Sequence, residues 1–272
     1  PLVLFSLITV GYSANALGGA GGPLAVLIIA IVAAELGKAV SKETKVDILV
    51  TPLVTIFAGV GLSMLIAAPI GAAASQVGTL IMWATEQAPL VMGILVSVIV
   101  GVALTLPISS AAICAALGLT GLAGGAAVAG CCAQMVGFAV MSYKENGVGG
   151  LVSQGLGTSM LQMGNIIKNP RIWIAPTLAS AITGPLATCL FHFEMNGAAV
   201  SSGMGTCGLV GQIGVYTGWV SDIAAGTKAA ITPMDWAAMV LLCFVLPAVL
   251  SVVFCEVERK LGWIKDGDLK LN

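Results

Sequence analysis

Long apolar segments alternate with short polar segments along the chain, and most acidic and basic residues fall in the polar segments. Four apolar segments have close to the roughly 20 residues that a helix needs to cross a hydrocarbon core. They are residues 48–68, 90–106, 172–193 and 236–255. Residues 1–17 form a further apolar segment. Pro176 and Pro185 interrupt the third span, and Pro247 predicts a kink in the last.

Other uncharged stretches are too rich in glycine, or too polar, for simple spans. Residues 107–143 and 195–220 combine Gly and Ala with scattered hydroxyl and amide side chains, and residues 151–165 are short and polar. We interpret the first two of these stretches as broken helices and re-entrant hairpins, because irregular backbone at membrane depth must be shielded by protein or line a wet cavity. Residues 79–86 are predicted to form a short interfacial segment.

The composition places the chain in a bilayer. Of its 272 residues 58% are hydrophobic and only 8% are charged, whereas about 25% of the residues of a soluble domain are charged. Tryptophans stand at the ends of segments, as in an interfacial belt: Trp83, Trp173, Trp219 and Trp236. The expected fold class is therefore an all-α polytopic membrane protein. A net charge of −1 gives no reason to expect a nucleic-acid partner.

The basic residues predict the orientation, because Lys and Arg accumulate in short cytoplasmic loops. They cluster at residues 38–45, at 168–171 and in the C-terminal segment from Arg259 to Lys270. The C-terminus is therefore expected on the cytoplasmic side. Counting crossings from there, residues 107–143 start and finish inside, whereas residues 194–220 start and finish outside.

Two serine pairs lie in these opposed stretches. Ser109-Ser110 in "LPISSAAICAALGLTG" has a partial echo 92 positions later, at Ser201-Ser202 in "AAVSSGMGTCGLVGQ". The topology predicts an inverted repeat whose two tips meet near the midplane and hold a solute between them. The alternative is chance similarity between two small-residue helices, in which each serine bonds to a carbonyl one turn earlier.

Other polar side chains in these apolar stretches need partners if they are buried. The further candidates for solute binding are Gln134, Gln162, Asn165, Asn196 and Gln212. Polar contacts between helices are the alternative explanation for them. His192, the only histidine, and Glu194 are also candidates, although a solvated helix end would explain them as well. The proposed tips carry no fixed charge, which favours a neutral polyhydroxy solute but leaves an anion or a sodium ion open.

Several other site classes find no support in the sequence. All seven cysteines lie in apolar stretches without a C-x-x-C pair, which is typical of small buried residues and not of a disulfide framework or a zinc site. "GMGTCG", residues 203–208, matches G-x-G-x-x-G but follows no strand. No catalytic triad, carboxylate pair within a span, or Walker loop is present. We expect no cofactor, no metal and no self-contained catalytic site.

Four long motifs carry a resemblance to a known family. They are "KETKVDILVTPLVTI", "LTLPISSAAICAALGLTGLAGGAAVAGCCAQMVGFAVMS", "GLVSQGLGTSMLQMGNIIKNPRIWI" and "MNGAAVSSGMGTCGLVGQIGVYTGW". These resemble the bacterial PfoR-type membrane proteins, which are classed with the sugar phosphotransferase-system EIIC permeases. The likeness implies a multi-pass permease of the bacterial cytoplasmic membrane for a sugar-like solute, which a separate soluble IIB protein phosphorylates on the cytoplasmic side.

The resemblance also frames the domain organisation and the alternatives. Residues 1–255 would form the permease domain, preceded by further segments since the chain starts within an apolar run, and residues 256–272 a polar cytoplasmic tail. Glucose-type EIIC proteins use a His and a Glu near the sugar, and only His192 and Glu194 could play those parts here. A homo-oligomer, namely a dimer, is expected. Two alternatives remain open: a membrane sensor that regulates gene expression, and an ion-coupled secondary transporter.

Overall fold

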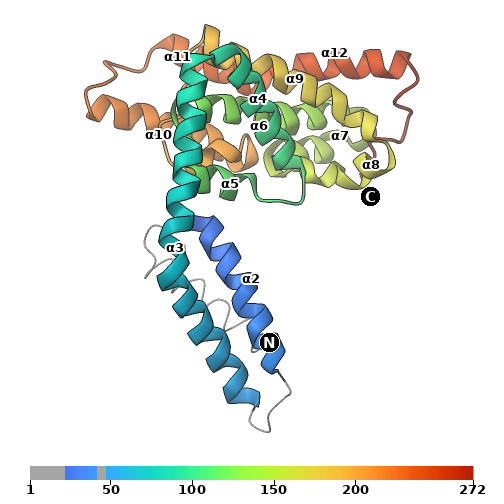
Figure 1. Cartoon of the computed structure of the whole chain (residues 1–272). Helices are drawn as coiled ribbons and strands as arrows, with labels where there is room; N and C mark the ends of the chain where they lie inside the picture. Colours follow the sequence, from blue (N-terminus) through green and yellow to red (C-terminus); the bar gives the residue numbers. More distant parts are fainter. Residues whose placement is uncertain (1–21, 42–46, 272) are drawn as a thin grey trace. The chain divides into compact units, whose positions relative to one another are not determined.

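The computed structural model describes residues 22–41 and 47–271 (Figure 1). The predicted apolar segment at residues 1–17 lies outside the described residues. The described part is helical throughout, apart from loops and one isolated bridge between Gly121 and Met195. This architecture confirms the all-α fold class.

The α-helices follow one another with short connections. Their bounds are α2 Gly22–Val40, α3 Asp47–Gln87, α4 Pro89–Thr105, α5 Ser110–Leu117, α6 Gly121–Met141, α7 Tyr143–Val152, α8 Met163–Lys168, α9 Ile174–Pro185, α10 Val210–Ala224, α11 Pro233–Val240 and α12 Leu246–Lys260. Three π-helical turns lie among them: η1 Ser153–Gly157, η4 Leu186–Leu190 and η7 Leu241–Val245. The 3₁₀ turns are η2 Ser159–Gln162, η3 Pro170–Trp173, η5 Ala199–Gly203 and η6 Cys207–Leu209.

Four described helices are long and apolar enough to cross a membrane. They are Leu49–Gln87, Gly121–Met141, Pro170–Leu190 and Pro233–Lys260, and Pro89–Thr105 is a shorter apolar helix. Two expectations were wrong. Residues 79–86 do not form a separate interfacial segment, since α3 continues without interruption to Gln87. Residues 121–141, expected within a broken stretch, form the continuous helix α6.

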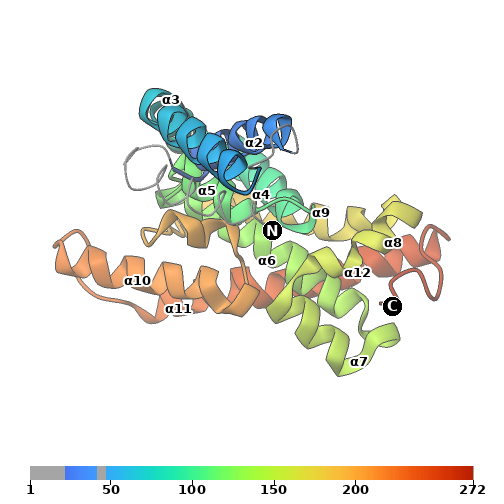
Figure 2. The same cartoon turned by 90° about the horizontal axis from the view of Figure 1, so that it is seen from below.

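The chain divides into two compact units. The smaller unit comprises residues up to 78 together with 115–117; in it, Ala25, Ile29 and Ala33 of α2 are buried in one cluster with Ala67 of α3. The larger unit comprises residues 79–114 and 118–272. Within the larger unit, α10 and α11 lie at one end and α7 and α8 at the other (Figures 1 and 2).

Helix α6 is the core of the larger unit because small residues occupy every face of it. Gly130 lies against the Ser97 backbone of α4, so closely that any Cβ would overlap the Ser97 carbonyl. Gly184 of α9 lies equally close to α4, and the Ser97 hydroxyl donates to the Ser180 carbonyl of α9 at 2.8 Å. Small residues let membrane helices approach at backbone distance. The glycines of residues 121–141, which suggested a broken helix in the sequence, are therefore the surface on which α6 packs.

Prolines locate two of the π turns. Pro185 directly precedes η4, which closes with a hydrogen bond from the Phe191 N–H to the Leu186 carbonyl. Pro247 follows η7 after one residue, and η7 closes from the Leu246 N–H to the Leu241 carbonyl. Proline has no N–H to donate and its ring crowds the preceding turn, so the π turn before Pro247 accommodates this proline and the helix continues. Turn η4 begins only after its proline.

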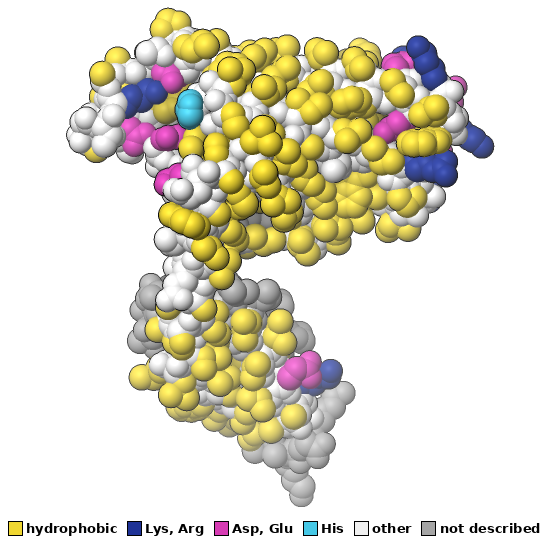
Figure 3. Space-filling view, turned by 45° about the horizontal axis from the view of Figure 1, so that its top comes forward, with side chains coloured by type: hydrophobic (Ala, Val, Ile, Leu, Met, Phe, Trp, Pro, Cys, Tyr) yellow, Lys and Arg dark blue, Asp and Glu magenta, His cyan; other side chains and the backbone are white. Residues whose placement is uncertain are grey.

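Charge is sorted to the two ends of the larger unit, with apolar side chains between them (Figure 3). Of the eight Lys and Arg in residues 118–272, only Lys228 belongs to the α10–α11 end. The other seven lie on α7, α8, η3, the end of α12 and the segment after it: Lys144, Lys168, Arg171, Arg259, Lys260, Lys265 and Lys270. The unit thus has an apolar middle band between two polar ends.

Candidate functional site

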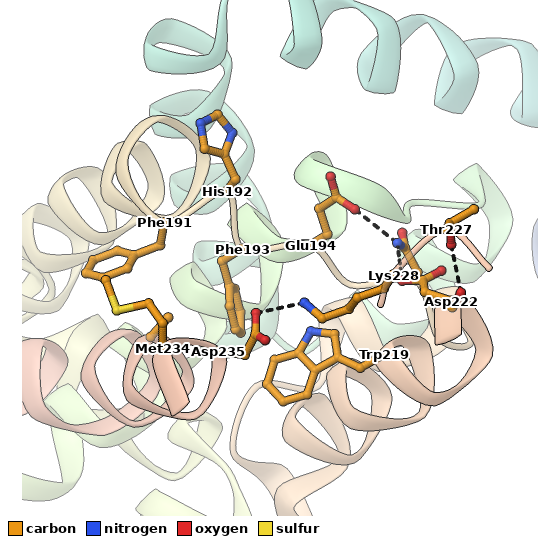
Figure 4. Close-up of a pocket in the computed structure, with 12 residues that line it drawn as sticks. Phe191, His192, Phe193, Glu194, Trp219, Asp222, Thr227, Lys228, Met234 and Asp235 are labelled. Carbon is orange, nitrogen blue, oxygen red and sulfur yellow. Dashed lines mark hydrogen bonds and ion pairs between the residues drawn. The ribbon is translucent and has the colours of Figure 1, made fainter. Parts of the chain in front are cut away.

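A cavity of about 510 Å³ lies at the α10–α11 end of the larger unit (Figure 4). Its walls come from residues 191–196, from α10, and from residues 227–238, which include the start of α11. We call it the α10–α11 cavity. Three of the predicted site residues line it, namely His192, Glu194 and Asn196. Its other lining includes Trp219, Asp222, Lys228 and Asp235, which the sequence did not single out.

Glycines of α10 place Asn196 at the cavity. The segment 196–205, which contains η5, lies directly on this helix, because Gly211, Gly214 and Gly218 face it. A Cβ on Gly218 would stand 2.8 Å from the Asn196 nitrogen, and one on Gly214 would overlap Ser201. The side chain of Asn196 then donates to Glu194 Oε2 at 3.1 Å and to Asp222 Oδ2 at 2.8 Å. One amide thereby holds two carboxylates of the cavity together.

The opposite wall is fixed by an ion pair. Lys228 Nζ lies 2.8 Å from Asp235 Oδ1 and also above the Trp219 ring, 5.6 Å from its centroid. The Thr232 N–H and hydroxyl both donate to Asp235 Oδ2, as part of the capping box that starts α11. Both carboxylate oxygens of Asp235 therefore already have partners within the protein, whereas Glu194 and Asp222 keep oxygens that can accept further hydrogen bonds.

An aromatic cluster supports the floor of the cavity. Trp219 is 5% exposed and meets Trp236 edge to face, with 5.6 Å between the ring centroids. Tyr216 lies 5.8 Å from the same Trp236 ring. Carboxylate acceptors beside an aromatic surface suit a ligand with many hydroxyl donors and an apolar ring face. Among the described residues, no group of three His, Cys, Asp or Glu side chains could hold a metal ion.

His192 adopts a left-handed backbone conformation, with φ at 43°. Positive φ is unfavourable for a residue with a Cβ, and such conformations cluster at functional sites. Its imidazole lies at the edge of the cavity and points away from the Lys228–Asp235 pair (Figure 4). His192 and Glu194 thus reach the same cavity, although their side chains point in different directions.

The two serine pairs lie away from this cavity, in segments that contact each other. The Ser110 hydroxyl donates to the Gly203 carbonyl at 2.6 Å, and the Ser202 hydroxyl donates to the Leu119 carbonyl at 2.7 Å. Ser109 is exposed and accepts from the Ala112 N–H, and Ser201 is buried. In this conformation the hydroxyls of Ser110 and Ser202 join the two segments; a solute-binding role for the four serines remains a prediction.

Gln134 lies fully buried in the middle of α6 and joins three helices. Its Oε1 accepts from Trp173 Nε1 at 3.0 Å and from the Thr105 hydroxyl at 3.4 Å, and its Nε2 donates to Thr177 at 3.3 Å. Gln212, on α10, donates to Cys132 Sγ, while its Oε1 has no partner among the described residues. Both sites favour polar contacts between helices, and Gln212 alone keeps a free acceptor.

Gln162 and Asn165 lie at the α7–α8 end, where they hold the C-terminal segment. Gln162 donates to Gln154 Oε1 and to the Leu269 carbonyl, both at 2.9 Å. Asn165 donates to Gln162 Oε1 at 2.8 Å and to the Lys270 carbonyl at 3.0 Å. Leu269 is fully buried, so the residues expected to form a polar tail fold back onto the larger unit.

The family of the chain follows from its sequence as a whole. Residues 1–271 match the family model described as phosphotransferase system, EIIC. This chain belongs to the phosphotransferase system EIIC family. It is accordingly a multi-pass membrane permease for a sugar, which confirms the resemblance at the level of the family. No curated protein and no solved structure gives a significant match to this EIIC protein.

A second internal echo runs through this EIIC protein, 48 residues apart. Val152–Leu161 reads VSQGLGTSML and Val200–Leu209 reads VSSGMGTCGL, with six identical positions in ten. The first copy contains η1 and precedes α8, and the second contains η5 and η6 and precedes α10. The two copies touch, since the Thr206 hydroxyl of the second donates to the Gly155 carbonyl of the first at 2.5 Å. This signal is stronger than the serine echo and was available in the sequence.

Replacing Thr206 with valine removes that hydroxyl while keeping the shape of the side chain. Thr206 is fully buried, so the Gly155 carbonyl loses its donor. We expect the free energy of unfolding in detergent to fall by about 1–3 kcal/mol. Thr217→Val is the matched control, because the exposed Thr217 hydroxyl bonds only within its own helix, and it should change stability by less than about 0.5 kcal/mol. Equal losses in the two variants would contradict a specific contact between the copies.

Proposed function

We propose that the α10–α11 cavity recognises the sugar that this EIIC permease transports. The observation that carries the proposal is the convergence of Glu194, Asn196 and Asp222 beside Trp219 in one cavity. Carboxylate oxygens accept hydrogen bonds from sugar hydroxyls, and an aromatic surface packs against the apolar face of a sugar ring. A phosphorylated sugar would be repelled there, because three carboxylates face one lysine.

The distribution of basic residues supports an outward orientation for this cavity. Seven Lys and Arg belong to the α7–α8 end of residues 118–272 and one to the α10–α11 end. Because Lys and Arg favour the cytoplasmic side, the C-terminus is proposed to lie inside the cell and the cavity outside. The permease would then receive free sugar from outside and hand it to a separate IIB protein at the α7–α8 end for phosphorylation.

The two VS-x-G-x-GT copies are proposed as the tips of an inverted repeat. Residues 143–168 would enter from the cytoplasmic side and residues 194–224 from the outside, which fits their places at opposite ends of the larger unit (Figure 1). Permeases with such repeats bind solute where the broken segments meet. The contact between Thr206 and Gly155 would be the closed constriction between the cavity and the cytoplasm. Assembly as a dimer also belongs to this proposal.

The function is tested by titrating the purified full-length chain with neutral sugars and following tryptophan fluorescence, since Trp219 lines the cavity. At least one aldose, ketose or sugar alcohol should change the emission with saturable binding. The 6-phosphate of the same sugar is the matched control and should bind at least tenfold more weakly. A panel without a single neutral ligand, or equal binding of the phosphate, would overturn the assignment of this cavity.

A further inference from the structure

Helix α12 carries a carboxyl group that does not line the α10–α11 cavity proposed for the sugar. Glu258 is 4% exposed, and neither of its carboxyl oxygens has a hydrogen-bond partner among the described residues. The acidic neighbour on the same helix turn differs from it. The side chain of Glu256 is 47% exposed, and its Oε1 lies 3.0 Å from Lys144 Nζ. A carboxyl group that is both buried and without a partner is exceptional, because buried polar groups are nearly always hydrogen-bonded.

Glu258 belongs to a polar stripe on the buried face of α12. Ser251, Cys255 and Glu258 follow one another at spacings of four and three residues, which places them on one side of a helix. Each of the three is buried. Ser251 lies against Gly137 of α6, which Pro176 of α9 also approaches, and the Ser251 hydroxyl has no partner in the described part of the chain. The stripe thus faces α6 and α9, away from lipid.

The surroundings of Glu258 offer no counter-charge. Cys255 packs in an apolar cluster with Phe138, Ile172, Ile264 and Leu269. Helix α9 contains no titratable residue, and those of α6, Cys131 and Cys132, lie at its middle.

Most of the basic groups near this turn have other partners, and Lys260, two residues after Glu258, is exposed. Arg259 bonds Glu145 at 3.1 Å and Asp266 at 2.9 Å, and the Arg171 guanidinium lies over the Trp263 ring. Lys144 is paired with Glu256. The C-terminal segment carries four further charged residues, Lys265, Asp266, Asp268 and Lys270. The buried residues of this segment are Ile264 and Leu269. The titratable neighbour of Glu258 on its own face is therefore the Cys255 thiol.

We propose that Glu258 is a proton-binding site, occupied in this conformation and emptied when the α7–α8 end of the larger unit opens. A buried carboxylate that has neither a cation nor a hydrogen-bond donor from the protein is so unfavourable that such a group takes up a proton instead. The site is separate from the α10–α11 cavity and does not rest on the sugar assignment. Its ligand class is the proton, which is unrelated to the transfer of phosphate by a IIB protein.

Release of the Glu258 proton would loosen the packing of the C-terminal segment against α12. The Glu258 carbonyl accepts from the Trp263 N–H, and there the chain turns back so that Ile264 and Leu269 join the apolar cluster. A carboxylate formed beside that cluster has to reach water, and it can do so only if the C-terminal segment or α12 moves. Because the closed conformation holds the proton, lower pH favours it, and rising pH shifts the equilibrium towards the open one.

Infrared spectroscopy of the purified full-length protein at neutral pH tests the proton directly. The wild type should show the carbonyl stretch of a protonated carboxylic acid, and Glu258→Gln should lose it. Glu256→Gln, two residues away on the exposed face, is the matched control and should keep it. Absence of the band from the wild type, or its persistence in Glu258→Gln, would overturn the proposal.

Thermal unfolding between acidic and alkaline pH provides the second readout. The melting temperature of the wild type and of Glu256→Gln should fall as pH rises through neutrality, whereas Glu258→Gln, the neutral isostere of the acid, should show a flatter profile. If Glu258→Gln does not fold, Glu258→Met takes its place, because an apolar side chain of similar length needs no partner there. Profiles of unchanged slope in a folded Glu258 variant would contradict a proton held at this site.

Discussion

Valine in place of Gly130 should prevent the larger unit from packing. Gly130 is buried in α6, and a side chain there would run into the Ser97 backbone of α4, which cannot move without displacing α9 as well. We expect a loss of at least about 3 kcal/mol, since overpacking against backbone has no flexible group to yield. The measurement is thermal unfolding in detergent, together with the yield of monodisperse protein.

Gly61→Val is the control for this substitution. Gly61 lies inside α3, and nothing lies within 4 Å of the position that its Cβ would occupy. The same chemical change there should leave the melting temperature within a few degrees of the wild type. A Gly130→Val protein as stable as the Gly61→Val protein would show that the close approach of α4 and α6 is not required by the fold.

Neutralising the two carboxylates that Asn196 holds in the α10–α11 cavity should strongly weaken sugar recognition. In the double variant Glu194→Gln/Asp222→Asn, hydrogen bonds from sugar hydroxyls to charged acceptors become bonds to neutral amides. A bond to a charged group contributes about 1.5–3 kcal/mol and a bond to a neutral group about 0.5–1.5 kcal/mol. The two replacements together therefore lose about 2–3 kcal/mol, and we expect the affinity to fall by about 30- to 150-fold. Binding is measured by the tryptophan titration described above, and uptake by radiolabelled sugar in cells.

The matched control is Glu35→Gln. Glu35 is exposed on α2 and lies 3.9 Å from Lys38, so its charge serves neither the cavity nor the core. Its loss should leave sugar affinity and uptake unchanged within about twofold. If the double variant keeps its melting temperature and its affinity, the sugar binds elsewhere, and the contact between the two repeat copies becomes the next place to test.

The spans were predictable because a bilayer imposes length and apolarity on any helix that faces it. Helix α6 does not follow this rule, because other helices enclose it and most of its residues are small. Gly124, Gly125 and Gly130 therefore read as helix breakers although they form a packing surface. Where a helix is surrounded by other helices, a high glycine content therefore does not distinguish a broken segment from a tightly packed helix.

The cavity could be predicted only in part, for a topological reason. His192, Glu194 and Asn196 stood out because they interrupt an apolar context. Asp222 belongs to the next polar stretch, and only the fold of residues 194–224 brings its carboxylate to the Asn196 amide. The internal echo, in contrast, was visible in the sequence, because the copies at Val152 and Val200 share six identical positions. The first copy by itself indicates only a stretch too short and too polar for a span. Comparison of the two polar stretches would have found it.

The two π turns next to proline connect the cavity to the rest of the larger unit. Turn η4 ends at Leu190, just before the 191–196 wall, and η7 separates α11 from α12. A π turn already contains one residue more than a regular turn, so it can change pitch without breaking a long run of hydrogen bonds. A narrowing of the cavity around the proposed sugar would therefore need rotation at these two short segments only, while α6 and its neighbours stay still.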